Sequence, residues 1–236
     1  MWTGPYETTL LEGAPMVAAM GEMGYAAASI GNHDFDFGVR VLSEHGARAR
    51  FPFLAANLVE TATGEAPRFA KPFTILEAGG VKVGVVGLTN VDSPISSDPR
   101  HLTGLSFLPY AESLEKWIPR ARAAGAEEIV VLIHEELAHA DELMAVLRKH
   151  RVRAAAFGHH HQAGARVDDG GTPDLDDDVS VCNAGAYLRS YCRIDLSFAS
   201  GKLTARAVKV APVEAAVGAR PQHEDSRLVA IVQSAE

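Results

Sequence analysis

The chain has 236 residues, of which 47% are hydrophobic and 22% charged, a composition typical of a globular protein with a core of normal size. Its net charge of -8 comes without a basic cluster, so binding to a nucleic-acid backbone is not expected. No apolar run approaches the roughly 20 residues of a membrane-spanning helix, and we expect no signal peptide in this sequence.

Helical and strand patterns alternate through most of the chain. In chain order the pattern predicts a helix at 10–23, a strand at 26–30, a helix at 37–49, a strand at 53–58, a hairpin of 73–77 with 81–88, a helix at 111–124, a strand at 129–133, a helix at 141–150 and a strand at 154–157. Three further strands are predicted at 179–183, 191–198 and 203–210, before a linker and helix at 213–236. This order predicts an α/β fold with mixed sheets.

The first predicted strand runs directly into the sequence GNHDFDFG, which begins at Gly31. A glycine there lets the backbone turn sharply off the strand. The amide oxygen of Asn32 can ligate a divalent metal, and His33 can donate a hydrogen bond to a phosphoryl oxygen. Asp36 can hold the His33 ring in one tautomer. The alternative is a helix N-cap formed by Asn32 or Asp34 beside a surface histidine.

Two later strands also end in histidines. His134 follows the strand at 129–133, although a lone histidine there is by itself more typical of a structural role. In GHHHQ, His159 and His161 would share one face of an extended segment while His160 points away. Two imidazoles on one face suit zinc, manganese, iron or nickel, and the alternative is a histidine-rich surface loop. Because ligand sites of open α/β sheets lie beyond the carboxyl ends of strands, we expect the three clusters to converge in one cleft.

Taken together, GNHD, a strand-end histidine and GHxH resemble the motifs of the calcineurin-like metallophosphoesterases. The longer GNHDFDFG is similar to the 5′-nucleotidase branch, which includes UDP-sugar hydrolases and 2′,3′-cyclic nucleotide phosphodiesterases. The resemblance spans roughly residues 10–210. It implies an αββα sandwich of two mixed sheets and metal-dependent hydrolysis of phosphate esters, with nucleoside 5′-monophosphates or related nucleotides as substrates. It also implies two divalent ions, such as Zn, Mn, Fe or Co, and a periplasmic or extracellular full-length protein.

The resemblance assigns roles to six residues. The matched metal ligands are Asn32, His134 and His159 for the second ion and His161 for the first. The residues that match the catalytic pair are His33, which stabilises the transferring phosphoryl group, and its partner Asp36.

The chain also departs from the family. The family has an Asp-x-His motif on its first strand and then a Gly-Asp whose carboxylate bridges both metals, whereas no aspartate precedes Asn32 here. We therefore expect residues 1–212 to be a catalytic domain without its first strand–helix unit, and residues 213–236 to lead toward a C-terminal nucleotide-binding domain that is not in this sequence. We expect at most one weakly bound ion. Two alternatives stay open: a non-catalytic metal-binding or interaction module, and a thiosulfohydrolase-type relative, against which Asp36 argues.

Other polar and sulfur-containing residues receive simpler interpretations. Cys182 and Cys192 could form a disulfide in an oxidising compartment, but the pattern favours two small buried strand residues. Five histidines without partners in the sequence pattern are predicted to be solvated, namely His45, His101, His139, His150 and His223.

Overall fold

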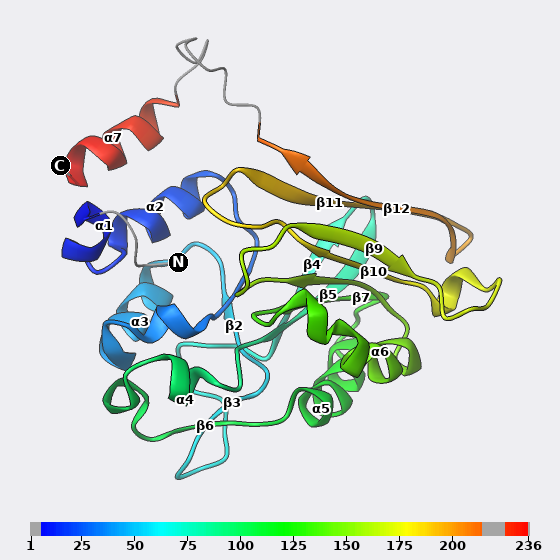
Figure 1. Cartoon of the computed structure of the whole chain (residues 1–236), viewed down its shortest axis with the longest axis horizontal. Coiled ribbons are helices and arrows are strands. Elements are labelled where there is room, and N and C mark those ends of the chain that lie inside the picture. The colour runs from blue at the N-terminus through cyan, green and yellow to red at the C-terminus, as the bar shows by residue number, and fades with distance from the viewer. Residues whose placement is uncertain (1–5, 214–224, 236) are drawn as a thin grey trace.

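The structure, a computed structural model, describes residues 6–213 and 225–235. Its centre is a six-stranded mixed sheet with the order β4-β5-β7-β8-β10-β9 (Figure 1). The strands of this sheet are β4 (Phe73–Ala78), β5 (Val81–Leu88), β7 (Glu128–Ile133), β8 (Val152–Phe157), β9 (Gly164–Asp168) and β10 (Val179–Asn183). The four inner strands are parallel, and the antiparallel strands β4 and β9 form the two edges.

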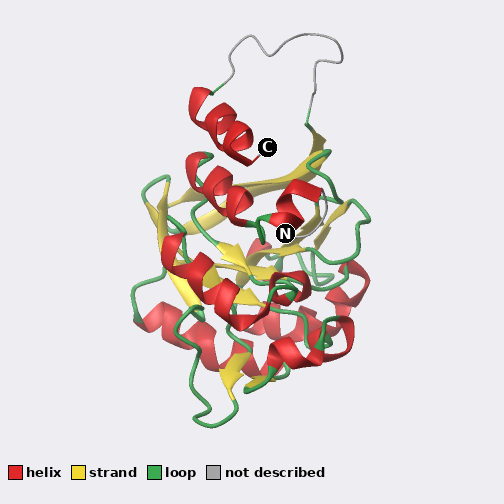
Figure 2. Ribbon diagram, turned by 90° about the vertical axis from the view of Figure 1, so that its left-hand side faces the viewer, coloured by secondary structure: helices red, strands yellow, loops and turns green. Residues whose placement is uncertain are grey.

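Helices α5 (Tyr110–Ala123) and α6 (Ala140–Lys149) connect β5 to β7 and β7 to β8. Both crossovers step in the same direction along the sheet, so right-handed connections place both helices on one face. Leu114, Ile118 and Leu147 on these helices are fully buried in a core that also contains residues of β7 and β8. Figure 2 shows helices above and below the strands, in keeping with the layered α/β fold that the sequence predicts.

A second core lies beside the carboxyl ends of the central strands. It is formed by α2 (Ala14–Glu22), α3 (Gly38–Arg48) and the short parallel pair of β1 (Ala28–Ser29) and β2 (Phe53–Leu54). The hydroxyl of Ser29 donates to the carbonyl of Leu88 at 2.8 Å, which ties β1 to the end of β5. The remaining small elements are α1 (Tyr6–Leu10), β3 (Leu58–Glu60), α4 (Ser93–Ser96) and β6 (Leu105–Phe107).

A long hairpin of β11 (Ser190–Ala199) and β12 (Lys202–Pro212) lies against β9 and β10 (Figure 1). Cys182 on β10 and Cys192 on β11 form a disulfide, with their Cα atoms 6.2 Å apart. The expectation of two unlinked buried cysteines is therefore wrong. Sequence spacing could not reveal the pairing, because the neighbourhood of β10 and β11 depends on how the hairpin folds back over the sheet.

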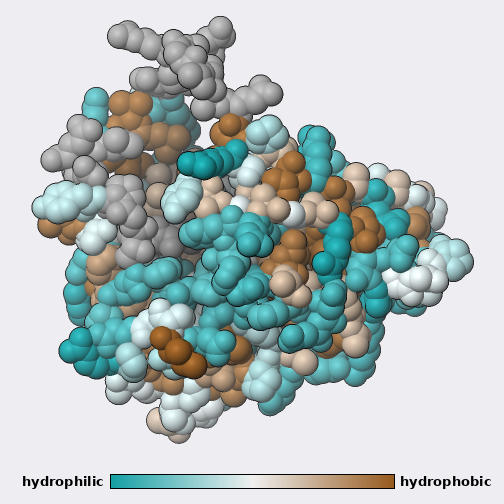
Figure 3. Space-filling model, viewed as in Figure 1, coloured by the Kyte–Doolittle hydropathy of each residue, from teal (hydrophilic) through white to brown (hydrophobic). Residues whose placement is uncertain are grey.

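The last helix, α7 (Ser226–Ala235), packs against α2, and Arg227 forms an ion pair with Glu22 at 3.2 Å. On the face shown in Figure 3, hydrophilic side chains dominate, with apolar side chains visible around α7. Within the described ranges, no helix has the length and apolarity that crossing a membrane would require. The linker predicted to precede α7 falls largely outside the described residues.

Some predicted elements differ from the structure in their boundaries. The helix expected over 10–23 is divided into α1 and α2, because Glu12 and Gly13 adopt left-handed backbone angles between them. The strand expected over 53–58 is divided into β2 and β3, and β9 was not predicted. His45, predicted to be solvated, is only 4% exposed, and its Nε2 contacts the carbonyl of Glu12 at 2.7 Å.

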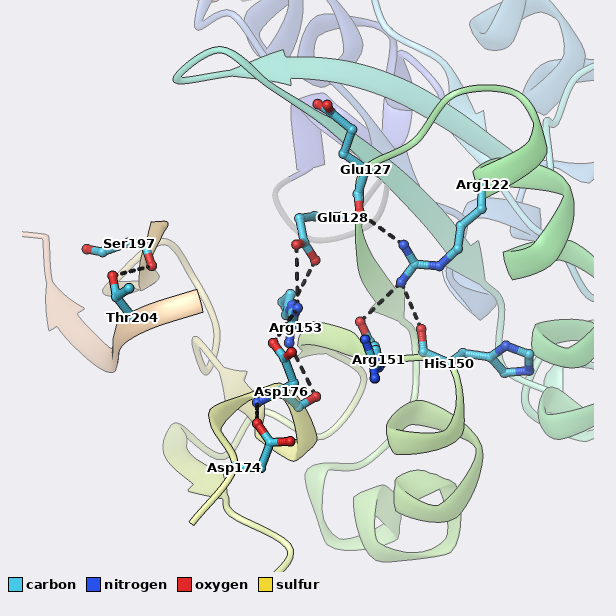
Figure 4. Close-up of polar contacts among 10 residues, drawn as sticks. All are labelled: Arg122, Glu127, Glu128, His150, Arg151, Arg153, Asp174, Asp176, Ser197 and Thr204. Atoms are coloured by element: carbon cyan, nitrogen blue, oxygen red, sulfur yellow. Dashed lines mark hydrogen bonds and ion pairs between the residues drawn. The ribbon is translucent and has the colours of Figure 1, made fainter. Parts of the chain in front are cut away.

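Figure 4 shows two arginines that bind groups at the amino-terminal ends of β7 and β8. The histidine clusters follow the other, carboxyl ends of these strands. Arg153 on β8 is buried and donates to Glu128 on β7 at 2.7 Å and to Asp176 at 2.8 Å. The Arg122 side chain, near the end of α5, donates to the carbonyls of Glu127 and His150 at 2.9 Å each. These contacts satisfy buried charges and strand-start carbonyls, so this edge has a structural role.

Candidate active site

A cavity of about 230 Å³ opens where β1, β7 and β8 end. Its lining consists of Ser29, Gly31, Asn32, His33, Asp34, His134, His159 and His161. All three sequence clusters thus meet around one space, as expected from their positions at the ends of strands. Of the six residues that match the family, only Asp36 is outside the lining, and it contacts His33 directly.

The GNHD segment forms a 3₁₀ turn over Asn32–Phe35, closed by a hydrogen bond of 2.8 Å from the Gly31 amide to the Asp34 carboxylate. Gly31 has a φ of -106°, which any residue can adopt, so a sharp turn is not the reason for glycine. A Cβ at Gly31 would lie 2.7–2.9 Å from three atoms of the His134 ring. Glycine is needed here because the backbone and this imidazole approach closely.

His33 and Asp36 form the predicted pair, with 2.9 Å between Nδ1 and Oδ2. The His33 side chain is 58% exposed, at the mouth of the cavity. A carboxylate at Nδ1 holds the proton on that nitrogen and orients the ring, leaving Nε2 available to a ligand. The backbone is also held, because Ser97 donates to the carbonyl of Asn32 at 2.8 Å.

His134 directly follows β7 and contacts Asn32 from the first cluster. The distance between His134 Nε2 and Asn32 Oδ1 is 2.9 Å. Burial lowers the pKa of His134 to about 3 and also lowers the pKa of His159, whose ring centroid lies 5.1 Å from that of His134. Both rings are therefore neutral near pH 7, which is the form that ligates metals.

The GHHH segment is not an extended strand, since β8 ends at Phe157 and His159 has a left-handed φ of 87°. The prediction that His159 and His161 share a face of an extended segment is therefore wrong. Both residues nevertheless line the cavity. His160 instead contacts Glu136, with 2.7 Å between its Nδ1 and the carboxylate. Its ring also lies edge-on to that of His159, with 5.5 Å between their centroids.

Sequence reasoning missed several polar residues at this end of the sheet. Ser29 and Asp34 line the cavity, and Glu135, beside His134, is buried with Asn90 and Tyr110 as hydrogen-bond partners. Asn183 ends the apolar strand β10, as His134 ends β7. The rule that located the histidines could therefore also have located Asn183.

The donors around the cavity fit a divalent cation of the borderline type. Imidazole nitrogens and one amide oxygen suit zinc, manganese, iron or cobalt. Asn32 and His134 already touch, and His159 is neutral beside them. However, no group of three or more His, Cys, Asp or Glu side chains within 6–213 and 225–235 comes together at metal-binding spacing. The cavity therefore fits a cation site with few protein ligands, all of them uncharged.

Comparison with known proteins supports the motif resemblance. No family model matches the chain. It is 31% identical over 131 residues to a 5′-nucleotidase of Vibrio cholerae, a match covering 56% of this chain and 23% of that protein. It is 33% identical over 129 residues to protein UshA of Salmonella pullorum, again covering 23% of the relative. A 2′,3′-cyclic-nucleotide 2′-phosphodiesterase/3′-nucleotidase of Yersinia enterocolitica is 31% identical over 133 residues, 52% of this chain and 20% of that protein.

Solved structures show the same fold over nearly the whole chain. The sulfate thiohydrolase SoxB of Thermus thermophilus superposes with a TM-score of 0.83 at 21% identity, covering 99% of this chain and 40% of that one. A 5′-nucleotidase precursor of Thermus thermophilus has a TM-score of 0.80 at 23% identity, covering 99% and 47%. The calcineurin-like phosphoesterase YfkN of Bacillus subtilis has a TM-score of 0.72 at 21% identity, covering 94% and 72%. The chain is thus similar in sequence to part of the 5′-nucleotidases and related phosphoesterases, and it shares the fold of the calcineurin-like phosphoesterases.

Proposed function

We propose that this domain serves the metal-dependent hydrolysis of phosphate esters, with nucleoside 5′-monophosphates or related nucleotides as substrates. The observation that carries the proposal is the meeting of the His33–Asp36 pair with Asn32, His134 and His159 around one cavity. The names of the homologous 5′-nucleotidases support the same reaction class. This chain matches about a quarter of the length of those proteins, so the identity of its substrate is part of the proposal.

In the proposed reaction, His33 acts on the phosphoryl group. Its Nε2 is left for a ligand because Nδ1 is held by Asp36. A donor at this position stabilises negative charge that develops on a phosphoryl oxygen in the transition state. Asp36 does not reach the substrate in this scheme; it orients the ring through Nδ1.

The proposed cation ligands are Asn32, His134, His159 and His161. A divalent ion bound there would polarise a phosphoryl oxygen and lower the pKa of an attacking water. We infer one ion per chain rather than two, because four neutral donors do not compensate the charge of two adjacent divalent cations. The neutral state of His134 and His159 suits this role.

A second candidate is a metal-binding or interaction module without catalysis. The small number of converging donors among the described residues favours it. A thiosulfohydrolase-type reaction is a further alternative, since SoxB shares the fold, but the contact of Asp36 with His33 favours ester hydrolysis. The Cys182–Cys192 disulfide supports an oxidising compartment, such as a periplasm or the cell exterior.

The test is phosphate release from AMP by the purified chain as Mn²⁺ is added. Hydrolysis should require the ion, stop with EDTA, and be lost in His134→Ala. The matched control is His160→Ala, which removes a neighbouring histidine that contacts Glu136 outside the cavity lining and should retain turnover. Metal binding without any phosphate release would favour the non-catalytic module, and turnover that survives His134→Ala would contradict the proposed site.

A further inference from the structure

A second cavity lies at the amino ends of β7 and β8, the opposite end of these strands from the candidate active site. Its volume is about 790 Å³. Its walls come from the end of α5, the start of β7, the connection from α6 to β8 and the turn between β11 and β12. Pockets that bind small molecules have volumes of roughly 300–1,000 Å³, so this cavity has room for a ligand.

The lining of this cavity carries more positive than negative side chains, in a chain whose net charge is -8. It contains five arginine or lysine side chains and three carboxylates. Two of the carboxylates, Glu128 and Asp176, bind the same cation, Arg153 (Figure 4). The third, Glu127, accepts from a backbone amide of β5 at 2.7 Å. Within the described parts of the chain, these carboxylates therefore form ion pairs with Arg153 alone.

The other cations of the lining differ in what compensates them. Lys149 is paired with Glu115, which lies outside the lining, at 2.6 Å. Arg151 and Lys202 are exposed, and neither side chain forms a hydrogen bond or an ion pair with another described residue. These two residues come from different walls, the α6–β8 connection and the β11–β12 turn. The cavity thus has uncompensated positive charge on two sides.

Arg122, on α5, adds a half-buried positive charge. Its guanidinium donates to two backbone carbonyls at 2.9 Å each, which leave its charge without a carboxylate (Figure 4). Burial lowers the pKa of this side chain, and the charge of Glu128 opposes that effect. The charges of Arg153 and Arg151 lower the pKa further. An anion in the cavity would relieve this repulsion between arginines.

The backbone at Arg151 indicates that its side chain has a use. Arg151 follows the C-cap of α6 and has a left-handed φ of 51°. Glycine is the usual residue at this position, because a Cβ makes the conformation costly. Strained backbone of this kind occurs preferentially at ligand sites. Since no contact of the Arg151 side chain within the described residues offsets the cost, a bound ligand is the better explanation for arginine here.

We propose that this cavity binds a small anion with two phosphoryl groups, held by Arg151, Lys202 and Arg122. Guanidinium groups bind phosphate through paired hydrogen bonds, and lysine binds it as a point charge. Two phosphoryl groups suit cations that approach from separate walls of a wide cavity. Phosphoryl groups also carry more charge and more acceptor oxygens than carboxylates. The proposal is independent of the proposed hydrolysis, because its residues lie at the other end of the strands.

Calorimetric titration with inorganic pyrophosphate in the presence of EDTA tests this proposal. The wild-type chain should bind one pyrophosphate, more tightly than it binds orthophosphate or malonate. Arg151→Gly and Lys202→Gln should each weaken binding by about tenfold or more, the effect of one hydrogen bond to a charged group. The matched control is Arg193→Gln, an exposed arginine of the same hairpin outside the lining, which should leave the affinity unchanged.

Arg151→Gly also separates binding from folding. Glycine fits the left-handed backbone, so this variant should keep or raise the urea midpoint while it loses affinity. A parallel titration with ADP distinguishes the sources of the diphosphate: binding at least as tight as that of pyrophosphate would identify an organic diphosphate, and weaker binding the inorganic ion.

Three results would overturn the proposal. The first is no binding of pyrophosphate to the wild-type chain, or unchanged binding in both Arg151→Gly and Lys202→Gln. The second is equal affinity for malonate, which would exclude a phosphoryl-specific site. The third is loss of pyrophosphate binding in His134→Ala, which would place the anion in the candidate active site instead.

Discussion

The residues around the cavity hold one another in place. Asn32 contacts His134 through its side chain, and its carbonyl is bound by Ser97. Gly31 leaves room for the His134 ring, since a Cβ at this position would lie less than 3 Å from three ring atoms. At this scale the sequence correctly located the side chains but not the reason for the glycine, because close approach between segments distant in sequence is a tertiary effect.

The His33–Asp36 pair yields a prediction at the same scale. His33→Ala should lower the rate constant for AMP hydrolysis by about 10²–10³, the usual cost of one transition-state donor, and leave Mn²⁺ affinity nearly unchanged. Asp36→Asn should cost less, because Asp36 orients the ring at 2.9 Å rather than touching the substrate. Rates and Mn²⁺ titrations on the three chains check this. Loss of the metal with an intact rate at saturating Mn²⁺ would show that His33 is a ligand instead.

At the scale of elements, the ends of β1, β7 and β8 position the site, and this could be predicted from short apolar runs that stop at polar clusters. The conformation of the loop after β8 could not be predicted, because the sequence carries no signal for the left-handed turn at His159. The end of β10 carries the same signal as the end of β7, and Asn183 has the same side chain as Asn32, so this position could have been predicted from the sequence.

The amino ends of β7 and β8 are linked by a buried ion pair whose removal should be costly. Arg153→Met should lower the free energy of unfolding by about 3–5 kcal/mol, since Glu128 would stay buried without its cation. Urea unfolding measures this. The matched control is Arg193→Met, which breaks an exposed pair with Asp195 and should cost less than about 1 kcal/mol. Similar losses in both variants would contradict the role assigned to burial.

At the scale of the whole molecule, the alternation of helices and strands predicted an α/β fold with mixed sheets, and the resemblance of the motifs implied the αββα sandwich. The hairpin of β11 and β12 over β9 and β10 was beyond prediction, because its placement depends on packing between distant segments. The disulfide follows from that placement, and it links β10 of the sheet to β11 of the hairpin.

The disulfide can be tested directly. In protein purified without reductant, neither Cys182 nor Cys192 should react as a free thiol, since the two are paired. Reduction should lower the free energy of unfolding by about 2–4 kcal/mol, as is typical for one bridge. Thiol titration and urea unfolding with and without reductant measure both effects. Two reactive thiols in the native oxidised protein would show that the bridge does not form.

The central claim is that side chains from the ends of three strands form a single cation site at the cavity. Equilibrium dialysis against Mn²⁺, with metal counted per chain, tests it most directly. We predict one ion per wild-type chain, loss of that ion in Asn32→Ala and in His134→Ala, and retention in His160→Ala. No bound ion in the wild-type chain, or an ion that survives both Asn32→Ala and His134→Ala, would contradict the account.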